Sequence, residues 1–230
     1  MTVSDDPSAG SRWSAADTVA GFSQSPPNAT LIQFAAQAMP AGGGRLLDIG
    51  CGAGRNAVPI AQLGWEVLGL DLSMPMLRAA AARTRVEQLS GCVRLALARM
   101  DALPVADRCV DFVVAHGIWN LARSAAEFRA AVREAARVAR PGAALFVFTF
   151  SRNTLPPHVQ PVGGEPFVFT EFSGEPQVFL TAEQLGLEMH AAGFAPDTAA
   201  PLQEHNLPRP GTLRTGKVPV IYEALFRRVP

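Results

Sequence analysis

The sequence contains a single lysine, Lys217, among its 20 basic residues. A lysine that forms a Schiff base needs neighbouring groups that lower its pKa, and nothing near Lys217 in the sequence would do so. We therefore exclude this covalent chemistry. The basic residues are balanced by 20 acidic ones, so no overall charge attracts the chain to nucleic acid or to an anionic membrane. We expect neither of these as a partner.

Cysteine is almost as scarce as lysine. Cys51, Cys92 and Cys109 form an odd, sparse set without metal-ligand spacing, which indicates reduced thiols and no metal site. Residues 1–11 are polar and lack the apolar segment of a signal peptide. No run approaches the roughly 18 apolar residues of a membrane span. Together these absences predict a soluble, cytoplasmic protein.

Hydrophobic residues, by contrast, make up 48% of the sequence. Short apolar runs alternate with alanine-rich helical stretches, which is typical of parallel strands joined by helical crossovers. We expect strands at 45–49, 66–70, 93–97, 110–115 and 144–150, with helices at 13–22, 29–38, 56–63, 74–89 and 125–139. A later helix begins at Thr181, and two further strands, 197–203 and 218–227, form an antiparallel hairpin around a loop with Pro208, Pro210, Gly211 and Gly216.

These elements predict an α/β fold with one doubly wound, mostly parallel seven-stranded sheet, helices on both faces and a C-terminal antiparallel hairpin. The 230 residues suit one domain, which we assign to residues 28–230. Residues 1–27 would be an N-terminal tail with a candidate lid helix that carries Trp13 and Phe22.

A segment at about 152–180 is rich in proline and phenylalanine and has no helical period. We interpret it as an insertion on the substrate side, with aromatic walls from Phe167, Phe169, Phe172 and Phe179. Phe167 and Phe169 alternate as they would in a strand, so a hairpin packed into the core is the competing interpretation.

The strongest local signal is the glycine turn at residues 48–54, Asp-Ile-Gly-Cys-Gly-Ala-Gly. Glycines between a strand and a helix let the backbone approach a ligand closely. A dinucleotide fingerprint requires a further glycine three residues after Gly52, but Arg55 occupies that position, and the Asp48 carboxylate would repel a diphosphate. The turn therefore favours a positively charged nucleoside. A glycine-rich turn without a ligand is the alternative.

Asp71 ends the next predicted strand, about 20 residues beyond the glycine turn. A carboxylate at this position can accept hydrogen bonds from both hydroxyls of a ribose. The structural alternative is a helix cap shared with Ser73. Because the glycine turn is also present, we favour ribose binding.

Two more motifs follow in order: Met-Asp-Ala-Leu-Pro at 100–104 and Val-Asp-Phe-Val-Val at 110–114. With the glycine turn and Asp71, they resemble the successive motifs of class I S-adenosylmethionine-dependent methyltransferases over about residues 45–150. The resemblance implies methyl transfer from S-adenosylmethionine to oxygen, nitrogen or sulfur of a small organic molecule, with S-adenosylhomocysteine as the product. It does not name the acceptor.

The resemblance also implies which residues hold the cofactor. The backbone around Gly50 and Gly52 would hold the methionine part, Asp71 the ribose and Asp101 the adenine amino group, while Asp48 would orient the cofactor's own amino group indirectly. The other implied cofactor contacts are Cys51, Leu72, Met76, Met100, Ala102, Ala115 and His116.

His116 and Met76 each have a second interpretation. His116 follows the fourth strand and is the candidate general base, because imidazole titrates near neutral pH; it would otherwise contact the cofactor or close a turn. Met76, implied to line the adenine pocket with Leu72, fits ordinary helix core equally well. His158 and His205 could face the substrate.

Several other functions stay open. Gly54-Arg55-Asn56 is similar to the helix start of methyltransferases that act on thiols, halides or metalloid oxyanions. Nucleic-acid and protein methylation are less favoured, since the charge is balanced and no Asn-Pro-Pro-Tyr type motif follows Val114. A non-catalytic S-adenosylmethionine-binding protein and a nicotinamide dehydrogenase, which Arg55 disfavours, complete the alternatives. We expect a monomer or a homodimer.

Overall fold

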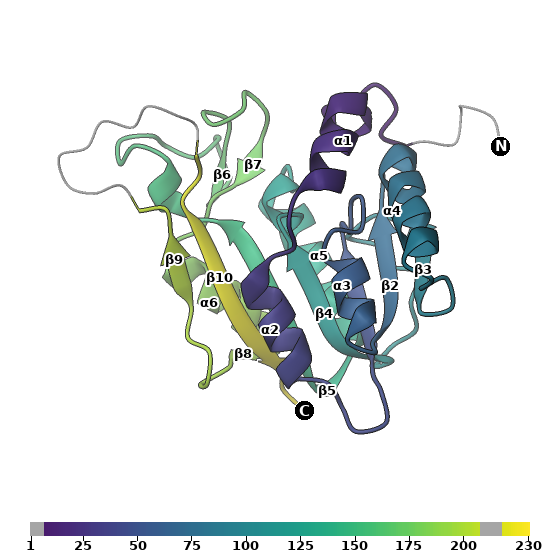
Figure 1. Ribbon diagram of the computed structural model, residues 1–230. Coiled ribbons are helices and arrows are strands. Elements are labelled where there is room, and N and C mark those ends of the chain that lie inside the picture. The colour runs from purple at the N-terminus through teal and green to yellow at the C-terminus, as the bar shows by residue number, and fades with distance from the viewer. Residues whose placement is uncertain (1–6, 208–217) are drawn as a thin grey trace.

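A mostly parallel sheet of eight strands forms the centre of residues 7–207 and 218–230, the part of the chain that the computed structural model describes (Figure 1). The strand order is β3-β2-β1-β4-β5-β10-β8, and β9 also pairs with β10. Strands β1 to β5 run parallel, whereas β10 is antiparallel to β5. The strands are β1 Arg45–Ile49, β2 Glu66–Asp71, β3 Val93–Leu97, β4 Val110–His116, β5 Ala139–Phe150, β8 Phe194–Pro196, β9 Gln203–His205 and β10 Ile221–Arg228.

Helices cover both faces of this sheet, and a separate two-stranded sheet, β6-β7, lies outside it. None of the helices in the described ranges is long and apolar enough to cross a membrane. The remaining elements are the 3-10 helices η2 Arg12–Ser14, η3 Trp119–Leu121 and η4 Arg152–Thr154, the helices α1 Ala16–Gln24, α2 Ala29–Gln37, α3 Ala57–Gln62, α4 Met74–Val86, α5 Ala125–Val138 and α6 Ala182–Ala191, and the strands β6 Val168–Phe169 and β7 Gln177–Val178.

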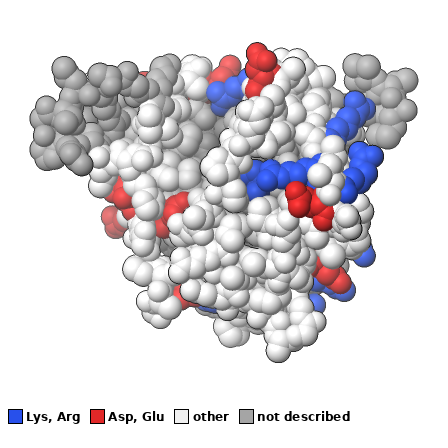
Figure 2. All heavy atoms as spheres, viewed as in Figure 1, with Lys and Arg blue, Asp and Glu red and all other residues white. Residues whose placement is uncertain are grey.

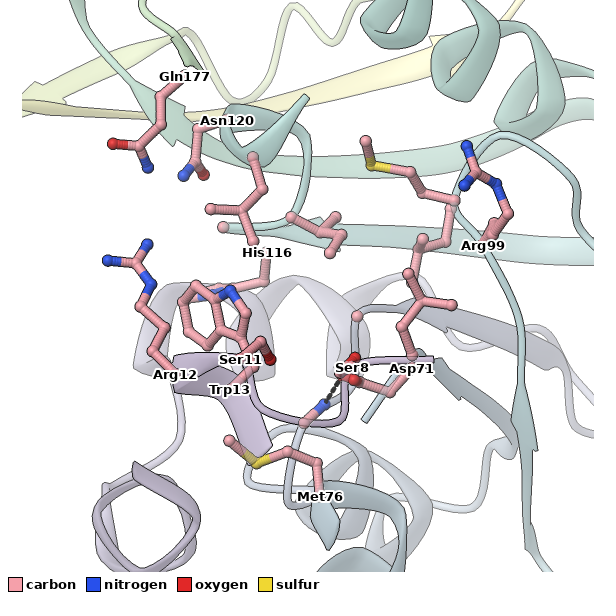
Figure 3. A pocket seen from close by; sticks show the side chains of 18 of the residues that line it. Ser8, Ser11, Arg12, Trp13, Asp71, Met76, Arg99, His116, Asn120 and Gln177 are labelled. Carbon is pink, nitrogen blue, oxygen red and sulfur yellow. Dashed lines mark hydrogen bonds between the residues drawn. The ribbon is translucent and has the colours of Figure 1, made fainter. Parts of the chain in front are cut away.

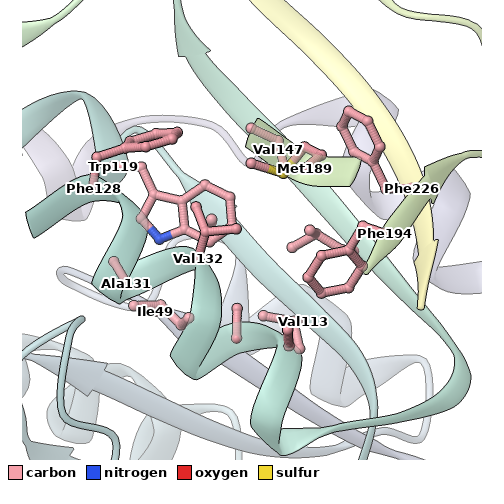
Figure 4. Packing of buried hydrophobic residues seen from close by; sticks show 14 of the residues in the cluster. Ile49, Val113, Trp119, Phe128, Ala131, Val132, Val147, Met189, Phe194 and Phe226 are labelled. Carbon is pink, nitrogen blue, oxygen red and sulfur yellow. The ribbon is translucent and has the colours of Figure 1, made fainter. Parts of the chain in front are cut away.

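The core consists of two layers, one on each face of the sheet. Leu46 and Val114 belong to the layer that packs against α2 and α3. Their neighbours Leu47 and Val113 point the other way, into the layer formed with α5 and α6 (Figure 4). Because both faces are covered, successive residues of a central strand are all buried. This explains why the central strands read as nearly continuous apolar runs.

The strand order reverses at β1. From β1 the chain moves outward to β2 and β3, then returns to the other side of β1 for β4 and β5. In doubly wound sheets the loops at such a reversal diverge and leave a crevice at the carboxyl ends of the strands, where ligands bind. The fold therefore directs attention to the ends of β1, β2 and β4.

The predicted α/β architecture is confirmed, with differences at particular elements. The sheet has eight strands rather than seven because β9 adds a short edge to β10. The strand expected at 197–203 is wrong: Asp197 accepts a hydrogen bond from Ala199 N at 2.9 Å and turns the chain between β8 and β9. Helix α4 ends at Val86, earlier than expected, and Gln88 just beyond it has a positive φ of 57°.

Some expectations fall outside the described residues. These are the loop residues Pro208, Pro210, Gly211 and Gly216, the lone Lys217, and the first six residues of the N-terminal tail. On the face seen in Figure 2, uncharged side chains predominate and basic side chains gather mainly on the side of α4.

Candidate active site

A cavity of about 890 Å³ lies at the carboxyl ends of β1, β2 and β4 (Figure 3). Its volume falls within the roughly 300–1,000 Å³ typical of small-molecule sites. We call one part of its lining the turn side, made of Gly50, Gly52, Asp71, Met100 and Asp101, and another the insertion side, made of Asn120, Phe148, Phe150, Phe172 and Gln177. Of the residues implied as cofactor contacts, the cavity is lined by Gly50, Gly52, Asp71, Leu72, Met76, Met100, Asp101 and His116.

The glycine turn is fixed to β2 by its own backbone. Gly50 N and Cys51 N both donate to Leu70 O, at 2.7 and 2.9 Å. Gly50 and Gly52 have φ values of 74° and 53°, a region that L residues avoid. A Cβ on Gly50 would lie 2.8 Å from the side chain of Ile118, so this position also requires glycine for space.

Asp71 connects the turn to the start of α4. One carboxylate oxygen accepts from Gly52 N at 2.8 Å, and the other accepts from Ser73 N, also at 2.8 Å. Ser73 in turn caps α4 by accepting from Met76 N. The cap alternative is thus partly right, but each carboxylate oxygen can accept more than one hydrogen bond, and Asp71 also lines the cavity.

Asp48 lies beneath the turn and does not line the cavity. Its Oδ2 is buried and has no hydrogen-bond partner within the described residues. Burial, reinforced by the nearby charge of Asp71, raises the pKa of Asp48 to about 7, although Arg55 acts in the opposite direction. The site therefore contains a buried acid that changes charge near neutral pH.

Asp101 is held in a two-pronged ion pair with Arg99. Arg99 Nε donates to Asp101 Oδ1 at 2.8 Å and Nη2 donates to Oδ2 at 2.7 Å, and this contact lowers the pKa of Asp101. Both side chains line the cavity beside Met100. Asp101 therefore remains ionised at neutral pH and can accept further hydrogen bonds at the cavity wall.

Besides Asp48, three residues implied as cofactor contacts do not line the cavity, so their contact with the cofactor stays a prediction. Cys51 and Ala115 are buried behind it, and burial, with the charge of Asp48, raises the pKa of the Cys51 thiol. Ala102 is exposed and does not line the cavity. Motif spacing alone could not separate these from their neighbours, because successive residues of a strand or turn point in different directions.

His116 lines the cavity but is a poor general base. Its ring stacks on Phe148 with centroids 4.2 Å apart. Arg55 Nη2 lies 3.3 Å from Nδ1, and Asn28 Nδ2 lies 3.2 Å from Nε2. Burial, together with the Arg55 charge, lowers the pKa of His116 to about 3. At neutral pH the imidazole is therefore uncharged, close to two donor groups and weakly basic, which argues against the general-base interpretation.

The aromatic residues of the 152–180 segment divide between core and cavity. Phe172 lines the cavity, as expected, and packs on Phe150 at 5.4 Å between ring centroids. Phe167, Phe169 and Phe179 are buried instead, with Phe169 in the β6-β7 pair, so the core interpretation is right for them. Neither His158 nor His205 reaches the cavity.

The N-terminal segment closes another wall of the cavity. Trp13 and Phe22 both line it and meet edge to face, with ring centroids 6.0 Å apart. Ser14 Oγ lies 3.1 Å from Ser73 Oγ, and Trp13 O accepts from Ser73 Oγ at 3.2 Å, which joins this segment to the start of α4. The two aromatic side chains therefore form part of the cavity wall, and the lid stays a prediction.

Comparison with known proteins adds independent information. Residues 47–147 match the family model described as "Methyltransferase domain". Over these residues the chain is similar to a methyltransferase domain. It is 39% identical over 119 residues to a ubiquinone/menaquinone biosynthesis C-methyltransferase of Syntrophotalea carbinolica, a match that covers 50% of this chain and 48% of that one. It is 34% identical over 115 residues to a demethylmenaquinone methyltransferase of Corynebacterium urealyticum, covering 50% and 45%. The chain thus spans about half the length of the curated relatives it matches.

Solved structures resemble the fold of this chain over most of its length. The CcbJ methyltransferase from Streptomyces caelestis has a TM-score of 0.67 and 18% identity, with 90% of this chain and 92% of that one covered. The [4+2]-cyclase SpnF has a TM-score of 0.66 and 23% identity, with 87% and 81% covered. At these identities the likeness establishes the fold only, and the second example shows that the fold also supports other chemistry.

Sequence reasoning assigned no role to Arg99, Asn120 or Gln177, although all three line the cavity of the methyltransferase domain. Asn120 follows β4, and the rule that ligands bind at strand ends could have found it. Gln177 lies in an aperiodic segment whose position beside η3 is a tertiary contact. No sequence signal pointed to it.

Proposed function

We propose that the protein transfers a methyl group from S-adenosylmethionine to a small organic molecule. The observation that carries the proposal is the position of Asp71, held by Gly52 N and Ser73 N at the edge of a cavity that also contains Met100 and Asp101. The motif residues thus meet at one ligand-sized site. The family match to residues 47–147 supports the same chemistry.

The residues present fit this cofactor. The buried and unpaired Oδ2 of Asp48 suits the charge of an ammonium group near the turn. A Cβ on Gly52 would project into the space between Phe22 and Met76, 3.7 and 4.0 Å from their nearest atoms, so glycine leaves this space to a ligand. Asp71 suits the ribose hydroxyls, and Asp101 suits the adenine amino group.

When bound, S-adenosylmethionine supplies an electrophilic methyl group on a positively charged sulfur. The chain's own contribution is to bind and orient the reactants and to exclude water, with Trp13 and Phe22 as one wall and Phe148 and Phe172 as another. Because the pKa of His116 is about 3, we assign it no proton transfer. The acceptor atom must therefore be nucleophilic at neutral pH without help from this histidine.

We also propose that residues 152–180, with the N-terminal segment, form the acceptor side of the domain. The relatives include proteins named as a C-methyltransferase and an O-methyltransferase of quinone biosynthesis, so the proposal extends to carbon as acceptor atom. The apolar walls of the insertion side favour an organic acceptor over halides and metalloid oxyanions.

Calorimetric titration with S-adenosylmethionine, S-adenosylhomocysteine and NAD tests the cofactor assignment. We expect micromolar binding of the first two and none of NAD, and binding of NAD alone would overturn the proposal. Turnover is then measured with methyl-labelled cofactor and panels of phenols, quinols, thiols and oxyanions. Cofactor binding without transfer to any acceptor, including those of a metabolite extract, would instead support a non-catalytic binding protein.

A further inference from the structure

An amide side chain with an unpaired oxygen belongs to the insertion side of the cavity. Asn120 is only 2% exposed, yet it lines the cavity. Its Oδ1 is buried and accepts no hydrogen bond from any described residue. An unpaired buried acceptor is destabilising, so its retention at a cavity wall needs an explanation. A ligand that donates an N–H or O–H to Oδ1 would supply one.

A second amide, Gln177, stands beside the first. Strand β7, which carries Gln177, packs against η3, which carries Asn120. Both side chains extend into the same open region of the cavity in Figure 3. Gln177 is 4% exposed, and its Oε1 accepts from Ser173 Oγ at 2.7 Å. This hydrogen bond orients the amide so that Nε2 remains to donate to a ligand.

The surroundings of the two amides suit a flat ring. Phe148 and Phe150 on β5 and Phe172 of the insertion line the same part of the cavity. Across from the amides, the Arg12 guanidinium lies over the Trp13 ring, 4.6 Å from its centroid, as Figure 3 shows. Aromatic walls with a few placed polar groups are typical of sites that fix the orientation of a planar ligand.

We propose that Asn120 and Gln177 are specificity-determining residues that read one edge of an aromatic acceptor, an edge that carries an N–H or O–H donor beside a carbonyl acceptor. Asn120 Oδ1 accepts from the donor, and Gln177 Nε2 donates to the carbonyl. This inference rests on the proposed function, because it describes the acceptor half of the same site. It narrows the acceptor from any small organic molecule to rings with a lactam-like or hydroxy-carbonyl edge.

The probe is 2-quinolone, a flat bicyclic lactam with N–H beside C=O, and its matched control is N-methyl-2-quinolone, which lacks the donor. Both are titrated by calorimetry with and without saturating S-adenosylhomocysteine. We expect 2-quinolone to bind about tenfold or more tightly than the N-methyl compound, because the latter leaves a buried acceptor unpaired.

The variants Asn120→Leu and Gln177→Met keep approximate side-chain size and remove the amides. We expect Asn120→Leu to bring the ratio of the two dissociation constants to within about threefold, because it removes the acceptor for the N–H. Gln177→Met should weaken both compounds, which share the carbonyl, and leave their ratio close to that of the wild type. Gln160→Met is the matched control, since Gln160 is exposed in the same segment and does not line the cavity. It should keep the wild-type ratio. Thermal melts followed by circular dichroism report folding. If Asn120→Leu does not fold, the weaker binding of both compounds expected for Gln177→Met still tests the inference.

The outcomes separate this inference from the proposed function. Failure of S-adenosylhomocysteine to bind would count against the proposed function. In that case the dissociation constants of the two quinolones, measured in the absence of S-adenosylhomocysteine, still test the roles of the two amides. Normal S-adenosylhomocysteine binding with an unchanged ratio in Asn120→Leu would mean that the N-methyl group is excluded by its size alone. Unchanged affinity for both compounds in Gln177→Met would mean that this amide does not read the carbonyl. Either result would overturn the inference. Absence of 2-quinolone binding under both conditions would overturn it as well.

Discussion

The turn side and the insertion side of the cavity differ in how their residues are brought together. The turn side comes from strand ends and the turns directly after them, between residues 50 and 101, and the backbone of its glycine turn is held by hydrogen bonds to the end of the adjacent strand β2. The insertion side takes side chains from η3, β5 and the 152–180 segment. The comparison shows why the turn side was recognisable from motifs, whereas the acceptor could not be named.

The largest effect is expected where the turn side depends on one carboxylate. Asp71→Ala should weaken S-adenosylhomocysteine binding about 100-fold, because hydrogen bonds to a charged group contribute about 1.5–3 kcal/mol each. Calorimetry measures the change. Asp107→Ala is the control, since the Asp107 side chain is 73% exposed and does not line the cavity. If Asp71→Ala weakened S-adenosylhomocysteine binding less than threefold, the assignment of Asp71 to the ribose would be wrong.

Asp48 should make cofactor binding pH-dependent. With a pKa of about 7 in the folded protein, Asp48 is mostly protonated at pH 6 and ionised at pH 8, and only the ionised form attracts an ammonium group. As the pH rises towards 7, we expect the dissociation constant of S-adenosylhomocysteine to fall by up to about tenfold per pH unit. Above pH 7 it should level off. Asp48→Asn should show a flat profile from pH 6 to 8, and a profile as steep as the wild type would contradict this origin.

The same raised pKa predicts a stability change without ligand. A carboxyl group with a pKa higher in the folded than in the unfolded chain stabilises the fold below about pH 4, and this contribution is lost as the pH rises through about 7. We therefore expect Asp48→Asn to melt at a higher temperature than the wild type at pH 8, with the difference shrinking at pH 5. Calorimetric melts at both pH values measure it, and a variant less stable at pH 8 would argue against an uncompensated charge.

His116 lies at the border of the two sides and should have a modest effect on rate. We expect His116→Gln to lower kcat less than tenfold, compared with the 10²–10⁴-fold typical of a lost general base. The pH profile of kcat should keep its shape near pH 6.5. A drop above 100-fold, with loss of a titration step from the profile, would restore the histidine as a base.

The smallest effect tests whether the two sides are separable. Phe172→Ala should leave the dissociation constant of S-adenosylhomocysteine within about twofold while weakening 2-quinolone several-fold, because the variant removes buried apolar contact on the insertion side only. Leu187→Ala, at a 62% exposed position on α6, is the control and should change neither. If Phe172→Ala weakened the binding of S-adenosylhomocysteine and of 2-quinolone to the same extent, the turn side and the insertion side would be coupled.

Expectations that rested on local chemistry were largely confirmed. The five parallel strands, the placement of Asp71 beside the glycine turn and the start of α4 at Ser73 follow from short segments whose hydrogen bonds are local or between adjacent strands. The strand expected at 197–203 failed because the side chain of Asp197 turns the backbone. The basicity of His116 could not be judged from local sequence, because burial and the Arg55 guanidinium, distant in sequence, lower its pKa.

The sequence by itself determined the α/β class and the motif order that points to a methyltransferase, because strand periodicity and glycine turns are properties of neighbouring residues. Tertiary structure alone decided which of those residues reach the cavity, that Asp48 is buried without a partner, and that Asn120 and Gln177 lie on one wall. The physical reason is that burial and side-chain direction depend on which segments pack together, and no short stretch of sequence specifies that packing.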